Sequence, residues 1–341
     1  MTDSTCSSSP DFVPADLDAT RWESVAPLYA DLLERPIRCQ NCLERLILDR
    51  SELDAAVSES EAELYIAMTC HTDDEAAQKA FLDFVENVEP ALREVSFELD
   101  RRIVENEHAA TLDQERYGVM LRDLRTDVEL FRKENIPLQT ELTKLDQEYS
   151  QICGAMTVMF RGQEETMARM GRFIEDTDRG VREEAWRAMA ERRFVDRDAI
   201  DGIFDEMIKR RHAMAQNAGF DNFRDFQHRR LRRFDYTPED CATFHDGVET
   251  VVVPLLRQLN ADRKRALDVD PLRPWDLSVD VKGRPALKPF ATADELVDRT
   301  SRMFHRMHAD LGSMFDELRG GGCLDLDSRK GKAPGGYQYQ R

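Results

Sequence analysis

The sequence lacks any long apolar run. Its longest, Val251–Leu256, falls far short of the roughly 20 apolar residues that cross a bilayer, and 34% of all residues are charged. The first residues, Met1–Thr5, offer neither the basic segment nor the apolar segment of a secretory signal. We therefore expect a protein without membrane association.

The chain also lacks an excess of positive charge. Its 48 lysines and arginines face 67 aspartates and glutamates, so the formal net charge is −19. This balance argues against nucleic acid as a partner, because its phosphates bind a basic surface. A negative charge of this size fits a protein that is kept apart from its neighbours by electrostatic repulsion.

Cysteine is present, but not in the pattern of a disulfide framework. The seven cysteines are odd in number and scattered, which favours a reducing compartment, and we expect the cytoplasm. Cys39 and Cys42 form a C-x-x-C pair, which suits thiol redox chemistry or half of a zinc site. Because no second pair of ligands follows, two cysteines on a helix surface or interface are the better interpretation.

Helical periodicity dominates what the sequence does contain. Phe81, Val85, Val88 and Leu92 recur at helical spacing. Thr72–Glu75 has the pattern of a capping box, in which a hydroxyl and a carboxylate satisfy free backbone N–H groups at a helix start. These signals predict a mainly α fold.

Two further helix starts stand in the second half of the chain. Thr237 precedes Pro238, which places a hydroxyl at the N-cap and proline at the first helical position. Thr292–Glu295 is another capping box, and its helix is expected to reach Leu318 before glycines stop it.

Strand patterns are confined to two places. Around residues 156–167 the apolar period shifts toward two and Arg161–Gln163 can turn the chain, which predicts a small β-hairpin. After Cys323, apolar and acidic residues alternate, and Gly335–Tyr339 has the pattern of a C-terminal strand.

Composition and these elements divide the chain into three parts. Residues 1–16, rich in Ser, Thr, Asp and Pro, are expected to be a disordered leader. Residues 17–177 are expected to form an N-terminal helical domain that ends in the hairpin. Residues 178–341 are expected to be the first part of a second domain, which is incomplete.

Several blocks in register resemble a known family. They are Asp178–Trp186, Arg210–Phe220, Tyr236–Glu239, Pro274–Leu277 and Asp327–Tyr337. In this order they are similar to oligoendopeptidase F, one of the zinc metallopeptidases that also include thimet oligopeptidase. The likeness is clearest from about Asp178 onward, and Met68–Cys70 and Asp73–Glu75 fit it loosely.

The resemblance implies a mostly helical oligopeptidase whose two halves enclose a deep channel that admits short unfolded peptides. It also implies one Zn²⁺ per intact enzyme, held by a His-Glu-x-x-His helix and a downstream glutamate. The metal acidifies a bound water, and the glutamate of the motif is the general base for attack on the peptide carbonyl. None of the seven histidines here is followed by glutamate, and in the family the motif begins a few dozen residues after the Gly-Gly-Tyr segment, beyond Arg341.

We therefore nominate no catalytic and no metal-binding residue. Gly335, Gly336 and Tyr337 are candidates for contact with substrate in the channel, by the resemblance, against the alternative of a tight turn between helix and sheet. His305 and His308 could share a metal on one helix face, but a packed or solvated helix position is favoured. The basic segment His228–Arg233 is interpreted as a helix end that nearby acidic residues neutralise, rather than a phosphate site.

The sequence thus favours the N-terminal portion of a zinc-dependent oligoendopeptidase, a hydrolase of internal bonds in short peptides. This chain alone is expected to be inactive and to bind no stoichiometric zinc. Its partners are expected to be short peptides, with no nucleic acid and no membrane. The alternative is a non-catalytic helical peptide-binding protein derived from such a peptidase.

Overall fold

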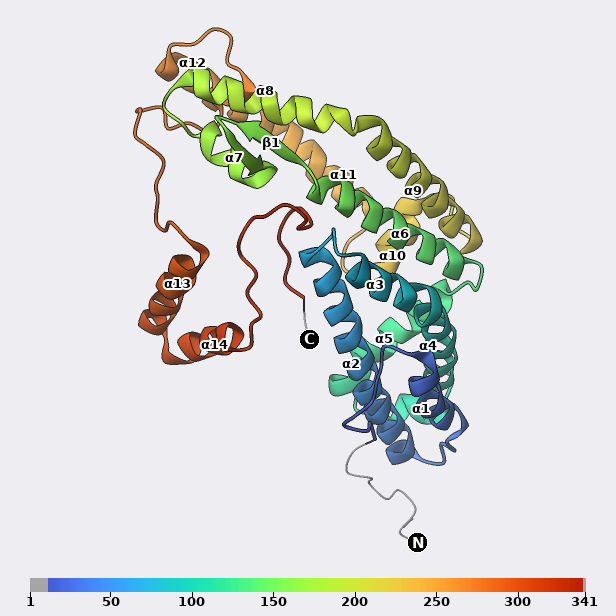
Figure 1. The fold of residues 1–341 in the computed structure, drawn as a ribbon. Helices are drawn as coiled ribbons and strands as arrows, with labels where there is room; N and C mark the ends of the chain where they lie inside the picture. Colours follow the sequence, from blue (N-terminus) through green and yellow to red (C-terminus); the bar gives the residue numbers. More distant parts are fainter. Residues whose placement is uncertain (1–11, 340–341) are drawn as a thin grey trace. The chain divides into compact units, whose positions relative to one another are not determined.

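The structure, a computed structural model, describes residues 12–339. Helices dominate this part of the chain, and its one sheet has two strands (Figure 1), so the mainly α fold is confirmed. The described part of the chain divides into two compact units: residues 12–151, 199–246 and 333–339 form unit 1, and residues 152–198 and 247–332 form unit 2. Among the described residues, no helix is long and apolar enough to span a membrane.

Unit 1 is built from helices. They are α1 (Trp22–Glu34), α2 (Gln40–Cys70), α3 (Glu75–Asn87), α4 (Glu89–Val104), the 3₁₀ turn η1 (Glu107–Thr111), α5 (Gln114–Leu130), most of α6 (Asn135–Gly154), most of α9 (Arg197–Asn217), α10 (Phe223–Arg230) and most of α11 (Pro238–Gly247). Of the predicted leader, residues 1–11 lie outside the described residues, whereas Phe12 and Val13 are partly buried against the core of this unit.

Helix starts follow the predicted chemistry with one correction. The N-cap of α3 is Asp74, whose carboxylate accepts from the Ala76 and Ala77 N–H groups at 2.8 and 3.2 Å, and not Thr72 as predicted. The hydroxyl of Thr237 does cap α11, where it accepts from the Asp240 N–H at 3.1 Å. Asp74 is the N-cap of α3 because it directly precedes the helix and because its negative charge is stabilised by the positive end of the helix dipole.

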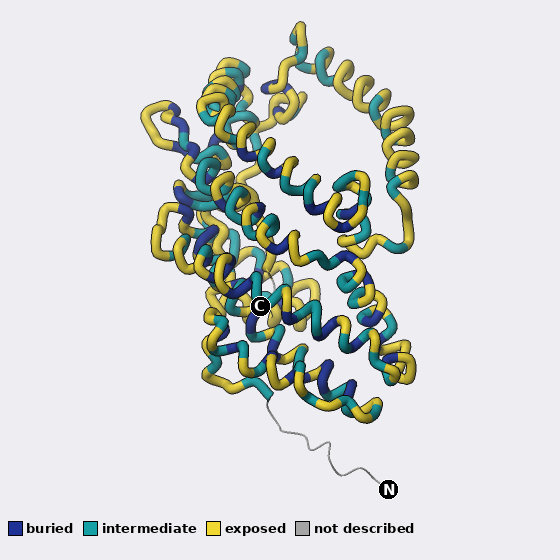
Figure 2. Tube along the Cα trace, turned by 90° about the vertical axis from the view of Figure 1, so that its right-hand side faces the viewer, coloured by how far each residue is buried: buried dark blue, intermediate teal, exposed yellow. Residues whose placement is uncertain are grey.

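The core of unit 1 lies where α1, α2, α4 and α5 bring their apolar faces together. Leu32, Leu43, Leu99 and Leu121 are fully buried there. Figure 2 shows the resulting pattern, in which buried residues recur along one side of several helices and exposed residues along the other. The stripe predicted from the sequence does face apolar neighbours: Phe81, Val85 and Val88 are buried at α3 and its C-cap, and Leu92 of α4 is partly buried against the core.

Unit 2 begins with the predicted hairpin. Strands β1 (Thr157–Phe160) and β2 (Gln163–Thr166) pair antiparallel, with Thr157 opposite Thr166 and Phe160 opposite Gln163. Arg161 and Gly162 both have positive φ, 51° and 83°, as the tight two-residue turn requires. The hairpin prediction is confirmed.

The remaining elements of unit 2 are helical. They are α7 (Met167–Ile174), α8 (Arg179–Val195), the π-helical turn η2 (Val248–Val252), α12 (Val253–Leu267), the 3₁₀ turn η3 (Pro274–Asp276), α13 (Ala293–Met307) and α14 (Ala309–Gly320). A small core joins the hairpin to α7 and α8 through Val158, Phe160, Met170 and Ala185.

The single helix predicted from Thr292 to Leu318 is wrong, because the chain breaks at His308. This residue is extended, with φ −163° and ψ 143°, and its Nδ1 accepts the Asp310 N–H at 3.2 Å, so that a new helix starts. Helix α14 then returns along α13, where Asp316 accepts from the Ser301 hydroxyl at 2.7 Å. The fold therefore replaces one long helix by a helical hairpin.

The predicted C-terminal strand is also wrong for the described residues. From Cys323 to Tyr339 the backbone is extended or turning, and it pairs with no strand in the described part of the chain. Its hydrogen bonds go to the ends of helices instead: the Gly331 N–H donates to Gly154 O at 3.0 Å, and the Ala333 N–H donates to Thr69 O at 2.8 Å. Alternating residues alone cannot distinguish this arrangement from a paired strand.

Candidate functional site

The C-terminal tail, which carries the three residues predicted to contact substrate, lies against the end of α2 in unit 1. The Tyr337 hydroxyl and the Thr69 hydroxyl are 2.5 Å apart. The Tyr337 ring lies 5.5 Å from the ring of Tyr65, and the Tyr339 ring lies 5.3 Å from it. We name Tyr65, Tyr337 and Tyr339 the tyrosine cluster.

The two predicted glycines have different roles at this site. Gly335 has a φ of 88°, which a residue with a side chain adopts only with strain, so it allows the turn that carries Tyr337 back to α2. A Cβ placed on Gly336 would meet no atom within 4 Å. The backbone there is open on the side of the missing side chain, as a contact surface for another chain requires.

A carboxyl group with an altered pKa lies near the tyrosine cluster. Burial and the charge of the nearby Glu89 raise the pKa of Glu61, while Arg93 acts in the opposite direction. Burial also raises the pKa of Tyr339, and the charge of Glu61 adds to that shift. The Tyr339 hydroxyl therefore keeps its proton at neutral pH and can donate a hydrogen bond, which suits the binding of a polar backbone but not nucleophilic attack.

Sequence reasoning missed the α2 half of this site. Glu61, Tyr65 and Thr69 are spaced four residues apart and so share one face of α2. That spacing was available from the sequence. What was not available is that the tail, more than 260 residues later, would fold onto this face (the Thr69–Tyr337 pair is separated by 268 positions).

The histidines that could have shared a metal are engaged separately. His305 Nε2 lies 2.7 Å from Asp316 Oδ2, and His308 caps α14. Among the described residues, no group of three or more His, Cys, Asp or Glu side chains is arranged to hold a metal. The arrangement therefore favours structural roles for both imidazoles.

The C-x-x-C pair occupies a helix start. Cys39 is the N-cap of α2 and its Sγ accepts from the Cys42 N–H at 3.4 Å, with the two sulfur atoms 3.1 Å apart. Both side chains are partly buried. The interpretation as two cysteines at a helix surface fits this placement.

The basic segment His228–Arg233 is mostly neutralised, as predicted, but by acids from another helix. Arg229 pairs with Glu129 at 2.7 Å and Arg232 pairs with Asp127 at 2.5 Å, and both acids lie in the last turn of α5. Arg230 makes no hydrogen bond or ion pair with the described residues and lines a cavity instead.

Comparisons with known proteins agree on one family. The sequence model of one protein family, described as the peptidase M3 N-terminal domain, matches residues 12–131. A second family model, described as peptidase family M3, matches residues 172–340. No curated protein gives a significant match.

Solved structures share the fold. A structure from Bacillus anthracis with the provisional name oligoendopeptidase F is similar with a TM-score of 0.86 and 22% identity, over 92% of this chain and 58% of that chain. PZ peptidase A, solved with an inhibitor, is similar with a TM-score of 0.88 and 24% identity, over 96% of this chain and 58% of that one. This chain thus spans less than two thirds of the length of the structures it matches.

Proposed function

Because this chain belongs to peptidase family M3, we propose that it is the N-terminal part of a zinc-dependent oligoendopeptidase that hydrolyses internal bonds of short peptides. The observation that carries the proposal is the extent of the structural match. Nearly all of this chain superposes on known peptidase chains, yet it accounts for only 57–58% of their length.

Exposed apolar side chains in unit 2 support the same proposal. Leu255 and Leu259 on α12 are each 53% exposed, and Met307 at the end of α13 and Met314 within α14 are 64% and 62% exposed. Neighbouring apolar side chains in water favour a covering partner. We propose that further chain of the same peptidase covers them.

The zinc site is not built from the residues present. The His-Glu-x-x-His motif is absent from the sequence, and the described histidines of α13 and α14 bind Asp316 and a helix start. These residues do not fit a catalytic zinc, so we assign no ligand and no catalytic step to this chain. The metal ligands of the proposed enzyme lie in a longer chain.

We propose a positioning role for the tail and α2. Gly335, Gly336 and Tyr337, with Tyr65 of α2, would form part of the wall against which a short peptide lies. The hydroxyl groups and the open backbone at Gly336 supply hydrogen bonds, and the rings supply apolar contact. The division into residues 17–177 and 178–341 and a cytoplasmic location remain parts of this proposal.

Peptide hydrolysis tests the proposal directly. We expect this 341-residue chain to leave a quenched fluorescent peptide intact, because it lacks the metal that activates water and the general base that acts with it. A chain extended with its downstream coding sequence should cleave the peptide, and a chelator should abolish that cleavage. Chelator-sensitive turnover by the short chain at the rate of the extended one would disprove the assignment.

The non-catalytic alternative rests on the missing motif alone. A stop codon directly after Arg341, together with binding of unfolded peptides by this chain, would favour a peptide-binding protein. A downstream reading frame that encodes His-Glu-x-x-His favours the peptidase.

A further inference from the structure

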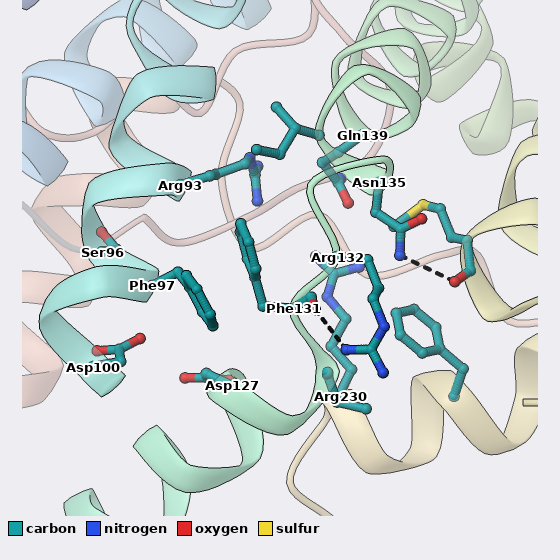
Figure 3. A pocket seen from close by; sticks show the side chains of 14 residues that line it. Arg93, Ser96, Phe97, Asp100, Asp127, Phe131, Arg132, Asn135, Gln139 and Arg230 are labelled. Carbon is teal, nitrogen blue, oxygen red and sulfur yellow. Dashed lines mark hydrogen bonds between the residues drawn. The ribbon is translucent and has the colours of Figure 1, made fainter. Parts of the chain in front are cut away.

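A cavity of about 240 Å³ lies inside unit 1, at the place where Arg230 leaves the basic segment (Figure 3). Helices α4, α5, α6 and α10 contribute to its wall. Three arginines line it, namely Arg93, Arg132 and Arg230. Their charges, and how far other groups compensate them, decide what the cavity can hold.

Arg230 carries the least compensated of these charges. It forms no hydrogen bond or ion pair with the described residues, and the residue as a whole is exposed at the rim of the cavity. Burial lowers the pKa of its guanidinium, and the charge of Arg93 lowers it further, while Asp127 acts in the opposite direction. Two cations that repel each other beside one cavity are stabilised by an anion between them.

The other two arginines add to the positive potential. Arg93 pairs with Glu89 through one terminal nitrogen at 2.8 Å, but its Nε is buried without a hydrogen-bond partner in the described structure. Arg132 donates only to backbone carbonyls, those of Glu129, Phe131 and Asn217.

The acids of the cavity are already neutralised by other residues. Asp100 pairs with Arg50 at 2.5 Å, and Asp127 pairs with Arg232 at 2.5 Å. The first turn of α6 also faces the cavity through Asn135 and Gln139, and a helix start favours negative charge. The balance of charge around the cavity is therefore positive.

The rest of the wall is apolar and aromatic. Phe97 and Phe131 stack with ring centres 4.0 Å apart, and Phe226 and Met214 line another part. In Figure 3, Arg93 and Arg230 lie on different sides of the cavity, with Phe131 between them. A small dianion such as phosphate would gain nothing from these rings, whereas a carboxylate joined to an apolar group would use both the charges and the rings.

We propose that this cavity is a binding site for a small monocarboxylate with an apolar body about the size of an amino acid side chain. The carboxylate takes hydrogen bonds from the guanidinium of Arg230, and the positive charge of Arg93 adds to the attraction. The side-chain amide of Gln139, which makes no hydrogen bond with the described residues, donates a further one. The apolar body lies against Phe97 and Phe131.

Calorimetry with 3-phenylpropionate and the 341-residue chain tests the site. We expect saturable binding at one site, and about tenfold weaker binding by the Arg230→Gln variant, on the scale of one lost charge-assisted contact. The matched control is Arg229→Gln, on the same helix but paired with Glu129 and outside the cavity, which should bind within about twofold of the parent. Neutral 3-phenylpropanamide should bind about tenfold more weakly than the acid.

Thermal unfolding separates binding from folding. Arg230 has no partner to lose, so Arg230→Gln should unfold at the parent temperature or above it, and only the parent should be stabilised by added 3-phenylpropionate. Gln139→Met, which breaks no side-chain hydrogen bond with the described residues, provides a second variant that should weaken binding without unfolding the protein. Absence of saturable binding, undiminished binding by Arg230→Gln and Gln139→Met, or equally tight binding of inorganic phosphate would each overturn the proposal.

Discussion

The carboxylate of Asp276 is the most enclosed charge in the described structure. It is fully buried, and it accepts hydrogen bonds from Arg179 and Arg182 at 3.0 to 3.2 Å and from the Arg273 N–H at 3.0 Å. Burial alone would raise its pKa, but these donors outweigh burial and hold the pKa of Asp276 below its ordinary value of 3.8. The stabilisation is present above that ordinary value and is lost as the pH falls through the lowered pKa.

Replacing Asp276 by Asn should destabilise the protein by about 3–5 kcal/mol, because Arg182 would keep its buried charge without a carboxylate. Denaturant unfolding followed by tryptophan fluorescence measures the loss, since Trp186 and Trp275 lie beside the site. The control is Asp280→Asn, whose partner Arg284 is exposed, and its cost should be far smaller than that of Asp276→Asn. Equal losses in the two variants would contradict the role given to burial.

The contribution of Glu61 to stability should depend on pH in the opposite direction to that of Asp276. The pKa of Glu61 is raised above the ordinary 4.5 by burial and by the charge of Glu89, so its ionisation at higher pH weakens the folded state. Glu61→Gln should therefore match the parent in stability near pH 4 and exceed it at pH 7. Glu63→Gln, at an exposed position of the same helix, should show no such difference. A Glu61→Gln variant that is less stable than the parent at pH 7 would disprove this account.

At the residue scale, the sequence predicted which charged side chains would be neutralised but not which residues would pair with them. The segment His228–Arg233 was expected to be neutralised by acids close in sequence. Its ion pairs instead reach Glu129 and Asp127, about 100 positions away. Charge patterns predict neutralisation, but only the packing of α10 beside α5 selects the partner and leaves Arg230 without one.

At the element scale, turn and helix-cap signals predicted the structure more reliably than the continuation of a helical apolar pattern. The hairpin at residues 157–166 and the helix after Thr237 follow directly from turn and cap chemistry. The break at His308 could not be predicted, because Phe304, Met307 and Leu311 keep a helical spacing through it. The break exists because α14 can pack back onto α13, a tertiary gain that no local pattern reports.

The pairing of α13 with α14 depends on a glycine. Gly312 is buried, and a Cβ placed on it would overlap the ring of His305. Glycine to alanine normally stabilises a helix by about 0.5–1 kcal/mol, but Gly312→Ala should instead destabilise the hairpin by about 1–3 kcal/mol through overpacking. Hydrogen exchange of residues 293–320 measures this local stability.

Gly202 supplies the matched control for that prediction. It lies in the interior of α9, it is exposed, and a Cβ on it would meet nothing within 4 Å. Gly202→Ala should therefore slow exchange in α9, while Gly312→Ala accelerates exchange in α13 and α14. The packing argument would be wrong if both substitutions slowed exchange.

At the scale of the whole molecule, sequence reasoning predicted the fold class and the family, and the comparisons confirm both. The two compact units could not be predicted, because each gathers segments that are distant in sequence. The tail at residues 333–339 belongs to unit 1 through its bonds to Thr69, whereas the segment just before it belongs to unit 2. Local sequence patterns do not indicate that consecutive segments of the chain belong to different units.

The last prediction concerns the exposed apolar stripe of Val251, Leu255 and Leu259, which are spaced four residues apart along η2 and α12. If further chain of a longer peptidase covers this stripe, the 341-residue chain should self-associate and bind an apolar dye in proportion to its concentration. The double variant Leu255→Gln and Leu259→Gln should reduce both signals. Val119→Gln, which removes an exposed apolar side chain from α5 in unit 1, should leave them unchanged.

A chain extended with its downstream coding sequence should bind less dye than the short chain, and equal dye binding by the two would remove the support that exposure gives to the proposed function.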